Sequence, residues 1–282
     1  AAFTIGKVAW LARHEPHHLR RTATMLLPHD HLTFLLTGER VTDRSDASGT
    51  GYFSADPGSA GRGGWRTDIL SDTVADRDWW PMLPDVLAPD EAAGTLTPDA
   101  AAELGIDPGA LVAAGGGDQH LAAQGIGLAE GDIAYSLGTS GVVFATTPNP
   151  VHDPSGAIDG VANVTGGYLP LVCSLNCTKV TDTMATLLAV DHATLGELAL
   201  AAPLTADRPV MAAYLDGERS PRLPWAHGML SGLTTATTRE QLALAAFEGV
   251  VLGLVRGERQ LAAHGITTSG RTIAVGGGAR SP

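Results

Sequence analysis

Residues 111–127, LVAAGGGDQHLAAQGIG, carry the pattern that decides the fold of this chain. An apolar run of strand length ends in three glycines, and an aspartate follows before an alanine-rich segment of helical composition. The stretch predicts a strand, a tight turn and a helix, because glycine lets the backbone adopt positive φ and approach a ligand closely. Asp118 then lies at the start of the helix. It either caps free backbone N–H groups or faces a substrate as a proton acceptor.

The end of the chain repeats this pattern. Residues 272–275 (TIAV) predict a strand, and three glycines at 276–278 follow it. A glycine turn that leads into a helix presents N–H groups to a phosphate or a nucleotide. The sequence therefore predicts a second ligand-facing turn here.

A third turn lies between these two. Residues 132–137 and 142–146 predict strands, and the segment Gly-Thr-Ser-Gly at 138–141 joins them as a hairpin. This turn offers backbone N–H groups and two hydroxyls to a phosphate. An ordinary hairpin turn needs no ligand, so both interpretations remain open on the residues alone.

Composition and charge exclude several classes of protein. The chain has 282 residues, which suits one large domain or two ordinary ones, and its 44% hydrophobic content is ample for a core. A net charge of −12 without basic clusters argues against a nucleic-acid or acidic-membrane surface. No apolar run reaches the length of a membrane span, and no signal pattern is present. Cys173 and Cys177 have no zinc-site spacing, which favours reduced thiols in a cytoplasmic protein.

The remaining elements follow from apolar spacing and from caps. Helices are expected over 4–14 with Thr4 as the cap, from Pro16 onward, and over 30–37, 98–104, 178–189, 194–201 and 238–264. Strands are expected over 23–27, 158–164, 168–173, 210–215 and 228–233. Gly249, Gly253 and Gly257 share one face of the last helix, and such a stripe permits close packing.

Two polar segments lie in the first half of the chain. Residues 41–51 are dense in Asp, Ser, Thr and Gly, which predicts a rigid loop whose side chains satisfy its own backbone. The second is a scatter of histidines that stand beside helix ends without the HExxH pattern: His14, His17, His18, His29 and His31. We therefore expect no metal site from the histidines.

Four blocks together resemble one family. They are GGGDQ at 115–119, SLGTSG at 136–141, YLDGERSP at 214–221 and GGGARSP at 276–282. This set, with GMLSGL at 228–233 and the segments QL and AAFE that follow it, is similar to the FGGY carbohydrate kinases. TDRSDASGTGYF at 42–53 and the order of the blocks most resemble the xylulokinase branch of that family.

The resemblance implies an α/β fold of the actin-like (ribonuclease H-like) two-domain ATPase type, truncated at both ends. Residues 1–128 would be the later part of the N-terminal sugar-kinase domain, and 129–282 the first part of the C-terminal nucleotide-binding domain. Family members also have an Asp-x-Gly-Thr phosphate loop and an early sugar-binding segment, which this chain lacks. A polypeptide of these 282 residues alone is therefore expected to be inactive and to aggregate.

The resemblance also implies a reaction, the ATP-dependent phosphorylation of D-xylulose to D-xylulose 5-phosphate. Asp118 would be the general base and would bind the sugar together with Gln119, although a glutamine on a helix surface is the alternative for Gln119. The residues expected near the nucleotide are Gly138, Thr139, Ser140, Thr178, Asp182, Gly277 and Gly278. No protein side chain is assigned to a metal, because Mg²⁺ would bridge the phosphates largely through water. Glu218 and Arg219 would form an ion pair that sets a loop.

The partners implied are a small sugar and ATP, with a homodimer allowed and no nucleic acid or membrane. Two alternatives stay open. Another FGGY kinase, for glycerol, ribulose or gluconate, would share the ATP turns and the role of Asp118. A non-catalytic actin-like ATP-binding module would share the turns but would need no base at that position.

Overall fold

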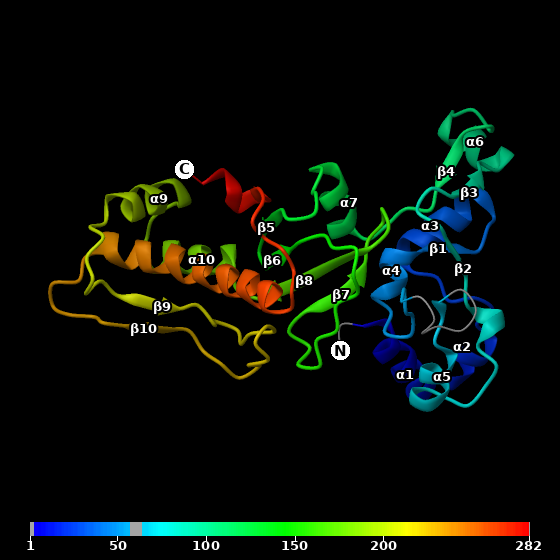
Figure 1. Ribbon diagram of the computed structural model, residues 1–282, viewed down its shortest axis with the longest axis horizontal. Coiled ribbons are helices and arrows are strands. Elements are labelled where there is room, and N and C mark those ends of the chain that lie inside the picture. Colours follow the sequence, from blue (N-terminus) through cyan, green and yellow to red (C-terminus); the bar gives the residue numbers. More distant parts are fainter. Residues whose placement is uncertain (1–2, 57–63, 282) are drawn as a thin grey trace. The chain divides into compact units, whose positions relative to one another are not determined.

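The computed structural model describes residues 3–56 and 64–281 of the chain, which folds as two compact units (Figure 1). Unit 1 contains the first part of the chain and one short later segment, and unit 2 contains the remaining residues. Unit 1 comprises 1–127 and 161–168; unit 2 comprises 128–160 and 169–282.

Unit 1 consists of short helices and two small sheets. Its helices are α1 (Thr4–His14), α2 (Pro16–Arg21), α3 (Pro28–Thr37), α4 (Arg44–Ser48), α5 (Thr67–Thr73), α6 (Pro98–Leu104) and α7 (Asp118–Gly125), with the 3-10 turn η2 (Trp80–Met82). The strands β1 (Val41–Asp43) and β2 (Asp85–Leu87) pair in parallel, and β3 (Ala92–Thr95) and β4 (Leu111–Ala113) pair antiparallel. Helix α1 packs against α2 and α5, and the core below them contains Val8, Leu19, Ala47, Tyr52, Trp65, Leu70, Trp79 and Met82.

The caps of two helices in unit 1 confirm the expected ends, although α3 begins at Pro28 and not at the expected Asp30. Gly38 ends α3 in the left-handed conformation, at φ +81°. Thr97 caps α6 by accepting the N–H of Ala100 at 3.3 Å, and Gly105 ends it at φ +68°.

Three expectations for unit 1 are wrong. Residues 23–27 form no strand, because Met25 N–H donates instead to the distant Met82 carbonyl at 2.8 Å. Thr4 is the first helical residue of α1 rather than its cap, which is Phe3. Residues 41–51 are not a loop throughout, since β1 and α4 form within them; the Asp43 side chain nevertheless braces the segment as the N-cap of α4.

Unit 2 is built on a five-stranded sheet of order β11-β5-β6-β8-β7. The strands are β5 (Ile133–Leu137), β6 (Gly141–Phe144), β7 (Asp159–Ala162), β8 (Tyr168–Ser174) and β11 (Thr272–Val275). The end of β7 and the first residue of β8 are assigned to unit 1. β5 and β6 form the expected antiparallel hairpin, β6 pairs antiparallel with β8, and β11 lies parallel to β5.

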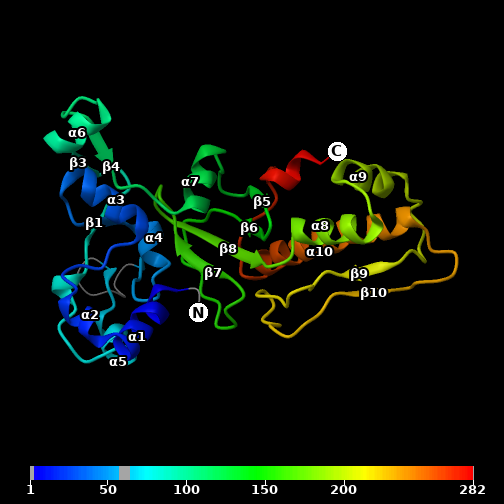
Figure 2. The ribbon, with the colours of Figure 1, turned by 180° about the vertical axis from the view of Figure 1, so that it is seen from behind.

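Three helices cover part of this unit. They are α8 (Thr178–Leu188), α9 (His192–Ala201) and α10 (Arg239–Ala263), and they contact one another (Figure 2). The antiparallel ribbon of β9 (Val210–Ala212) and β10 (Met229–Ser231) lies along α10. A 3-10 turn, η3 (Gly277–Arg280), follows β11.

Helix α10 begins with the capping box that its sequence predicts. Thr238 Oγ1 accepts the Gln241 N–H at 3.4 Å, and Gln241 Oε1 accepts the Thr238 N–H at 3.1 Å. A Cβ at Gly249 would lie 2.8 Å from the Met211 carbonyl oxygen, and one at Gly257 would lie 3.2 Å from Val172 Cγ1. These two glycines therefore permit close packing. Gly253 does not, since a Cβ there would meet nothing within 4 Å among the described residues.

Within residues 3–56 and 64–281, no single helix is long and apolar enough to cross a membrane. Helices α8 and α9 reach that length and apolar composition only when they are taken together, and a bend of 89° separates them.

Asp132 joins the two parallel strands at the edge of this sheet. The buried carboxylate accepts the Arg271 backbone N–H at 2.8 Å and the Arg271 Nε–H and Nη2–H at 3.0 and 2.6 Å. It also accepts the Ala129 N–H at 3.0 Å. The hydrogen bonds from Arg271 lower the pKa of Asp132 from 3.8 to about 2.

We expect Asp132→Asn to reduce stability in a pH-dependent way. The pKa of Asp132 is lower in the folded protein than its ordinary value of 3.8, so the ionised carboxylate stabilises the fold fully at pH values above 3.8. This stabilisation is lost as the pH falls through the folded pKa of about 2. The melting temperature of the variant should therefore lie furthest below that of the wild type near neutral pH and approach it in strong acid. Asp207→Asn, at an exposed aspartate of the same unit, is the control. If the melting temperature of Asp132→Asn lay below that of the wild type by the same amount near neutral pH and in strong acid, the charge of Asp132 would not explain the difference.

Candidate functional site

The glycine turn (residues 115–117) presents Asp118 at the start of α7. Gly115 has φ +86°, and a Cβ there would lie 2.8 Å from His29 Cδ2. A Cβ at Gly116 would lie 2.4 Å from Val164 Cγ1, and one at Gly117 would lie 2.6 Å from His120 Nδ1. The protein's own packing thus requires all three glycines.

Asp118 is not the N-cap of α7. Gly117 occupies that position in an extended conformation, at φ −61° and ψ 148°, and the helix has no side-chain cap. The Asp118 side chain is exposed, and its Oδ1 accepts the Gln119 N–H at 2.7 Å. Asp118 is therefore not the N-cap residue, although it accepts one free N–H of the first turn, and its carboxylate is exposed at the mouth of the turn.

Gln119 is half-buried next to Asp118. Its Oε1 is buried and has no hydrogen-bond partner within the described part of the chain. A buried acceptor without a donor is costly, so this oxygen suits a hydroxyl supplied by a ligand.

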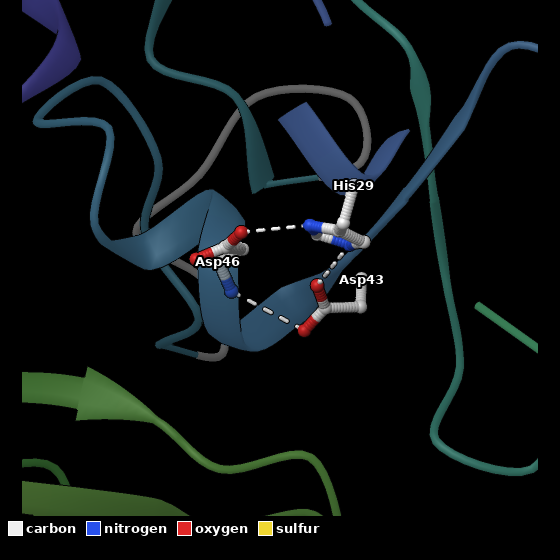
Figure 3. A group of neighbouring side chains, drawn as sticks. All are labelled: His29, Asp43 and Asp46. Carbon is white, nitrogen blue, oxygen red and sulfur yellow. Dashed lines mark hydrogen bonds and ion pairs between the residues drawn. The ribbon is translucent and has the colours of Figure 1, made fainter. Parts of the chain in front are cut away.

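A histidine cluster, made of one histidine and three aspartates, contacts the glycine turn. It consists of His29 and Asp30 on α3, Asp43 at the end of β1 and Asp46 on α4. His29 Nδ1 lies 2.8 Å from Asp46 Oδ2, and His29 Nε2 lies 3.2 Å from Asp43 Oδ2 (Figure 3). The same Nε2 lies 3.1 Å from Asp30 Oδ1. In the sequence the histidines were compared with one another, and His29 was not connected with Asp43 and Asp46, so this cluster was not predicted.

The charges of the cluster explain its pKa values. Hydrogen bonds to Asp43 and then to Asp46 raise the pKa of His29 from 6.5 to about 10, against the effect of burial. Burial alone would raise the pKa of Asp43, but hydrogen bonds from His29 and Ser45 leave it below its usual value. Burial raises the pKa of Asp30. These shifts favour a protonated, positively charged ring at neutral pH, with Asp30, Asp43 and Asp46 around it.

His29, Asp43 and Asp46 also lie close enough to hold a metal ion, since one ligand atom from each falls within 4.8 Å of the others. The geometry favours a proton on each ring nitrogen instead. Nδ1 lies 2.8 Å from Asp46 Oδ2, and Nε2 lies 3.2 Å from Asp43 Oδ2 in an ion contact without hydrogen-bond geometry. Each nitrogen therefore has a carboxylate oxygen beside it to balance the charge of a doubly protonated ring. We assign no metal to this cluster.

Three segments of unit 2 meet around the end of β5. Thr178 N–H donates to the Gly138 carbonyl at 3.0 Å, and Cys177 N–H donates to the Thr139 carbonyl at 3.3 Å. A Cβ at Gly278 would lie 2.9 Å from Leu137 Cβ and 3.0 Å from Thr178 Cγ2. The structure thus brings together the turn 138–140, the start of α8 and the glycines after β11, which the sequence singled out separately.

The residues in these segments differ in exposure. Thr139, Ser140 and Gly277 are exposed, while Gly138 and Thr178 are half-buried. Asp182 lies one turn further along α8, and its Oδ1 lies 3.4 Å from Nε2 of His192 at the start of α9. The exposed hydroxyls and N–H groups suit a phosphate.

The expected ion pair between Glu218 and Arg219 is wrong. Glu218 is buried, and its carboxylate accepts four protein donors: the Ser174 hydroxyl at 2.8 Å, the Leu175 N–H at 2.7 Å, Asn176 Nδ2 at 3.1 Å and the Arg219 backbone N–H at 2.7 Å. The Arg219 guanidinium pairs with Asp159 instead. Glu218 therefore holds the loop after β8 by accepting its donors.

Comparisons with known proteins match two domain models of one family to this chain. Residues 1–125 match the N-terminal domain of the FGGY family of carbohydrate kinases, and residues 133–282 match its C-terminal domain. A xylulose kinase from Streptomyces rubiginosus is 40% identical over 280 residues, which are 99% of this chain and 54% of that protein.

Solved structures of carbohydrate kinases are also similar to this chain. The crystal structure of xylulose kinase from Bifidobacterium adolescentis is 38% identical, with a TM-score of 0.84 over 99% of this chain and 58% of that one. A gluconate kinase from Lactobacillus acidophilus, 24% identical, shares the fold with a TM-score of 0.85 over 99% of this chain and 56% of its own. This chain spans about half the length of the curated relatives it matches.

Proposed function

Because the chain belongs to the FGGY family of carbohydrate kinases and has their actin-like α/β fold, we propose that the whole protein transfers the γ-phosphoryl group of ATP to D-xylulose, forming D-xylulose 5-phosphate. The observation that carries the proposal is the exposed Asp118 carboxylate on a glycine turn that the packing of unit 1 defines. The printed names of several relatives, xylulose kinases, support xylulose as the sugar.

Asp118 would act as the general base. Phosphoryl transfer depends mainly on alignment and on an acceptor for the hydroxyl proton. As the sugar oxygen bonds to the γ-phosphorus and the bond to ADP breaks, the proton would pass to the Asp118 carboxylate. The unpaired Gln119 Oε1 would accept a hydrogen bond from another hydroxyl of the sugar and so orient it.

The nucleotide would bind to unit 2. Gly138, Thr139, Ser140 and Thr178 would face the phosphates, and Gly277 and Gly278 would lie under the adenosine. Asp182 would stand at the edge of this site. Apart from Asp182, whose carboxylate lies 3.4 Å from His192 Nε2, these segments supply hydroxyls and N–H groups, so Mg²⁺ would be held mainly by the phosphates and water and would neutralise their charge.

The assignment of domains belongs to the same proposal. Residues 1–128 would be part of the sugar-kinase domain, and residues 129–282 would be part of the nucleotide-binding domain. The partners would be the sugar and ATP, in the cytoplasm where ATP is available, and a homodimer would be compatible with this function.

A panel of sugars tests the proposed function in the full-length protein. ADP formation would be measured with D-xylulose, D-ribulose, glycerol and D-gluconate. We expect kcat/KM for xylulose to exceed the others by at least about tenfold, since a site that pairs with sugar hydroxyls rejects sugars that leave its polar groups unpaired.

Other outcomes would replace the proposal. A preference for gluconate, which the structural neighbour of that name makes a specific alternative, would change the sugar and keep the kinase. ATP binding without phosphorylation of any sugar would favour an actin-like binding module.

A further inference from the structure

We propose that His29 is a positioning residue for phosphoryl transfer, because its ring ties together the carboxylates that hold the glycine turn and thereby places Asp118. The inference rests on the proposed function, since it takes Asp118 as the base. His29 touches neither reactant in this proposal. It acts through Asp43, Ser45 and the backbone of Gly117.

The first step leads from the ring to two elements. His29 lies in the first turn of α3, and its two nitrogens face Asp46 on α4 and Asp43 at the end of β1 (Figure 3). The same ring touches the glycine turn, because a Cβ at Gly115 would lie 2.8 Å from His29 Cδ2. One side chain thus contacts the strand, the helix and the turn.

The second step leads from the carboxylates to Asp118. Asp43 Oδ1 accepts the Ser45 N–H at 2.6 Å and also the Ser45 hydroxyl. Ser45 Oγ in turn accepts the Gly117 N–H at 3.0 Å, across 72 residues of sequence. Gly117 is the N-cap of α7 and directly precedes Asp118. The chain of contacts from His29 therefore ends one residue before the proposed base.

The third step concerns charge. Asp30 and Asp43 are 1% and 4% exposed, and Asp30 Oδ1 and Asp43 Oδ2 have no hydrogen-bond partner in the described residues other than their ion contacts with His29 Nε2. Removing the positive ring would leave these oxygens buried without a cation, which is strongly unfavourable. The carboxylates would move apart, and the turn would lose its support.

The carboxyl groups around His29 keep its ring positively charged over a wide range of pH. Asp30 lies on its own helix, and Asp43 and Asp46 lie on β1 and α4. The buried His120 on α7 interacts with Asp43 and Asp46 as well, and burial lowers its pKa. With a pKa of about 10 in the fold against 6.5 ordinarily, His29 stabilises the fold fully below about pH 6.5. The stabilisation is lost as pH rises through about 10.

Charge variants in the full-length protein test this inference. His29→Gln removes the charge, His29→Lys keeps a cation, and His31→Gln changes an exposed histidine of the same helix as a control. We expect His29→Gln to lower kcat about tenfold or more with the sugar KM changed less than about threefold, because a misplaced base slows chemistry more than binding. His29→Lys should restore most of the loss, and His31→Gln should behave as wild type.

A second measurement follows the turn itself. Amide hydrogen exchange in the peptide 111–121 should become faster in His29→Gln and return toward wild type in His29→Lys, since the Gly117 N–H is part of the chain of contacts. Asp46→Asn provides a milder variant if His29→Gln does not fold, because Asp46 is partly exposed and faces one ring nitrogen. It should change exchange and kcat in the same direction by a smaller factor.

The inference would be overturned by wild-type exchange and kcat in His29→Gln, or by a His29→Lys variant no better than His29→Gln. Failure of the proposed function is a separate result. If Asp118→Asn kept its turnover while His29→Gln still loosened the turn, the base would be misassigned and the support by His29 would stand. If Asp118→Asn lost its turnover while exchange in His29→Gln were unchanged, the positioning role would be wrong.

Discussion

Asn in place of Asp118 is expected to lower the turnover of the full-length protein about 100-fold or more, within the range that general-base catalysis contributes. The substitution keeps the shape of the side chain and removes its ability to accept the sugar hydroxyl proton. Because Asp118 is exposed and does not cap α7, the fold should tolerate the change. ATP affinity should stay near that of the wild type, since the segments proposed to bind the nucleotide belong to unit 2.

A matched control exists in the same unit. Asp99 lies in the first turn of the short helix α6 and is exposed, as Asp118 is in α7. Asp99→Asn should leave kcat and the melting temperature unchanged. If Asp118→Asn retained more than about a tenth of wild-type turnover, the loss would fall outside the general-base range and another group would have to accept the proton.

Valine at position 277 is expected to weaken ATP binding at least about tenfold without loss of stability. A Cβ at Gly277 would meet nothing within 4 Å in the described residues, and Gly277 is not among the glycines of positive φ. The fold itself therefore has room for a side chain there. If the adenosine lies against this backbone, valine fills the space of the ligand, and each 1.4 kcal/mol of lost contact weakens binding tenfold. Calorimetric titration with ATP and a thermal melt measure the two effects.

Valine at Gly276 or Gly278 cannot test the contact with adenosine, because it would disturb the fold itself. Gly276 has φ +92°, and a Cβ there would lie 2.8 Å from the Leu137 carbonyl oxygen, so valine would strain the fold directly. At Gly278 a Cβ would lie 2.9 Å from Leu137 Cβ. Gly253→Val on α10, another glycine with open space, is the control for an added side chain. Equal ATP affinity in Gly277→Val and Gly253→Val would move the adenosine away from this turn.

The elements that sequence predicted well are those whose signals are local. The cap Thr97 with Gly105, the box of Thr238 with Gln241 and the hairpin around residues 138–141 all depend on residues within a few positions of one another. The run 23–27 failed because its backbone pairing is with Met82, which no local pattern reveals. An apolar run of five residues is compatible with a strand but does not require one.

The same distinction applies to the candidate site. Asp118 and the glycines of both turns stand in compact motifs, and the sequence selected them directly. The histidine cluster joins residues 29, 43 and 46 to Gly117, and only the tertiary fold brings these together. Glu218 and Arg219 were paired because they are adjacent in sequence. Adjacent side chains need not face each other, and each of these found a distant partner.

The order of strands in unit 2 has a consequence for how this unit folds. β5 and β6 are adjacent in sequence and form a hairpin, but the other neighbour of β5 is β11, whose residue Thr272 pairs with Ile133. The entropy of closing so long a loop must be offset before this parallel pair gains its contacts, so such pairings form slowly. During synthesis one edge of β5 therefore stays open until β11 has left the ribosome. An unpaired edge can join strands of other chains, and expression at lower temperature or with chaperones should protect it during that interval.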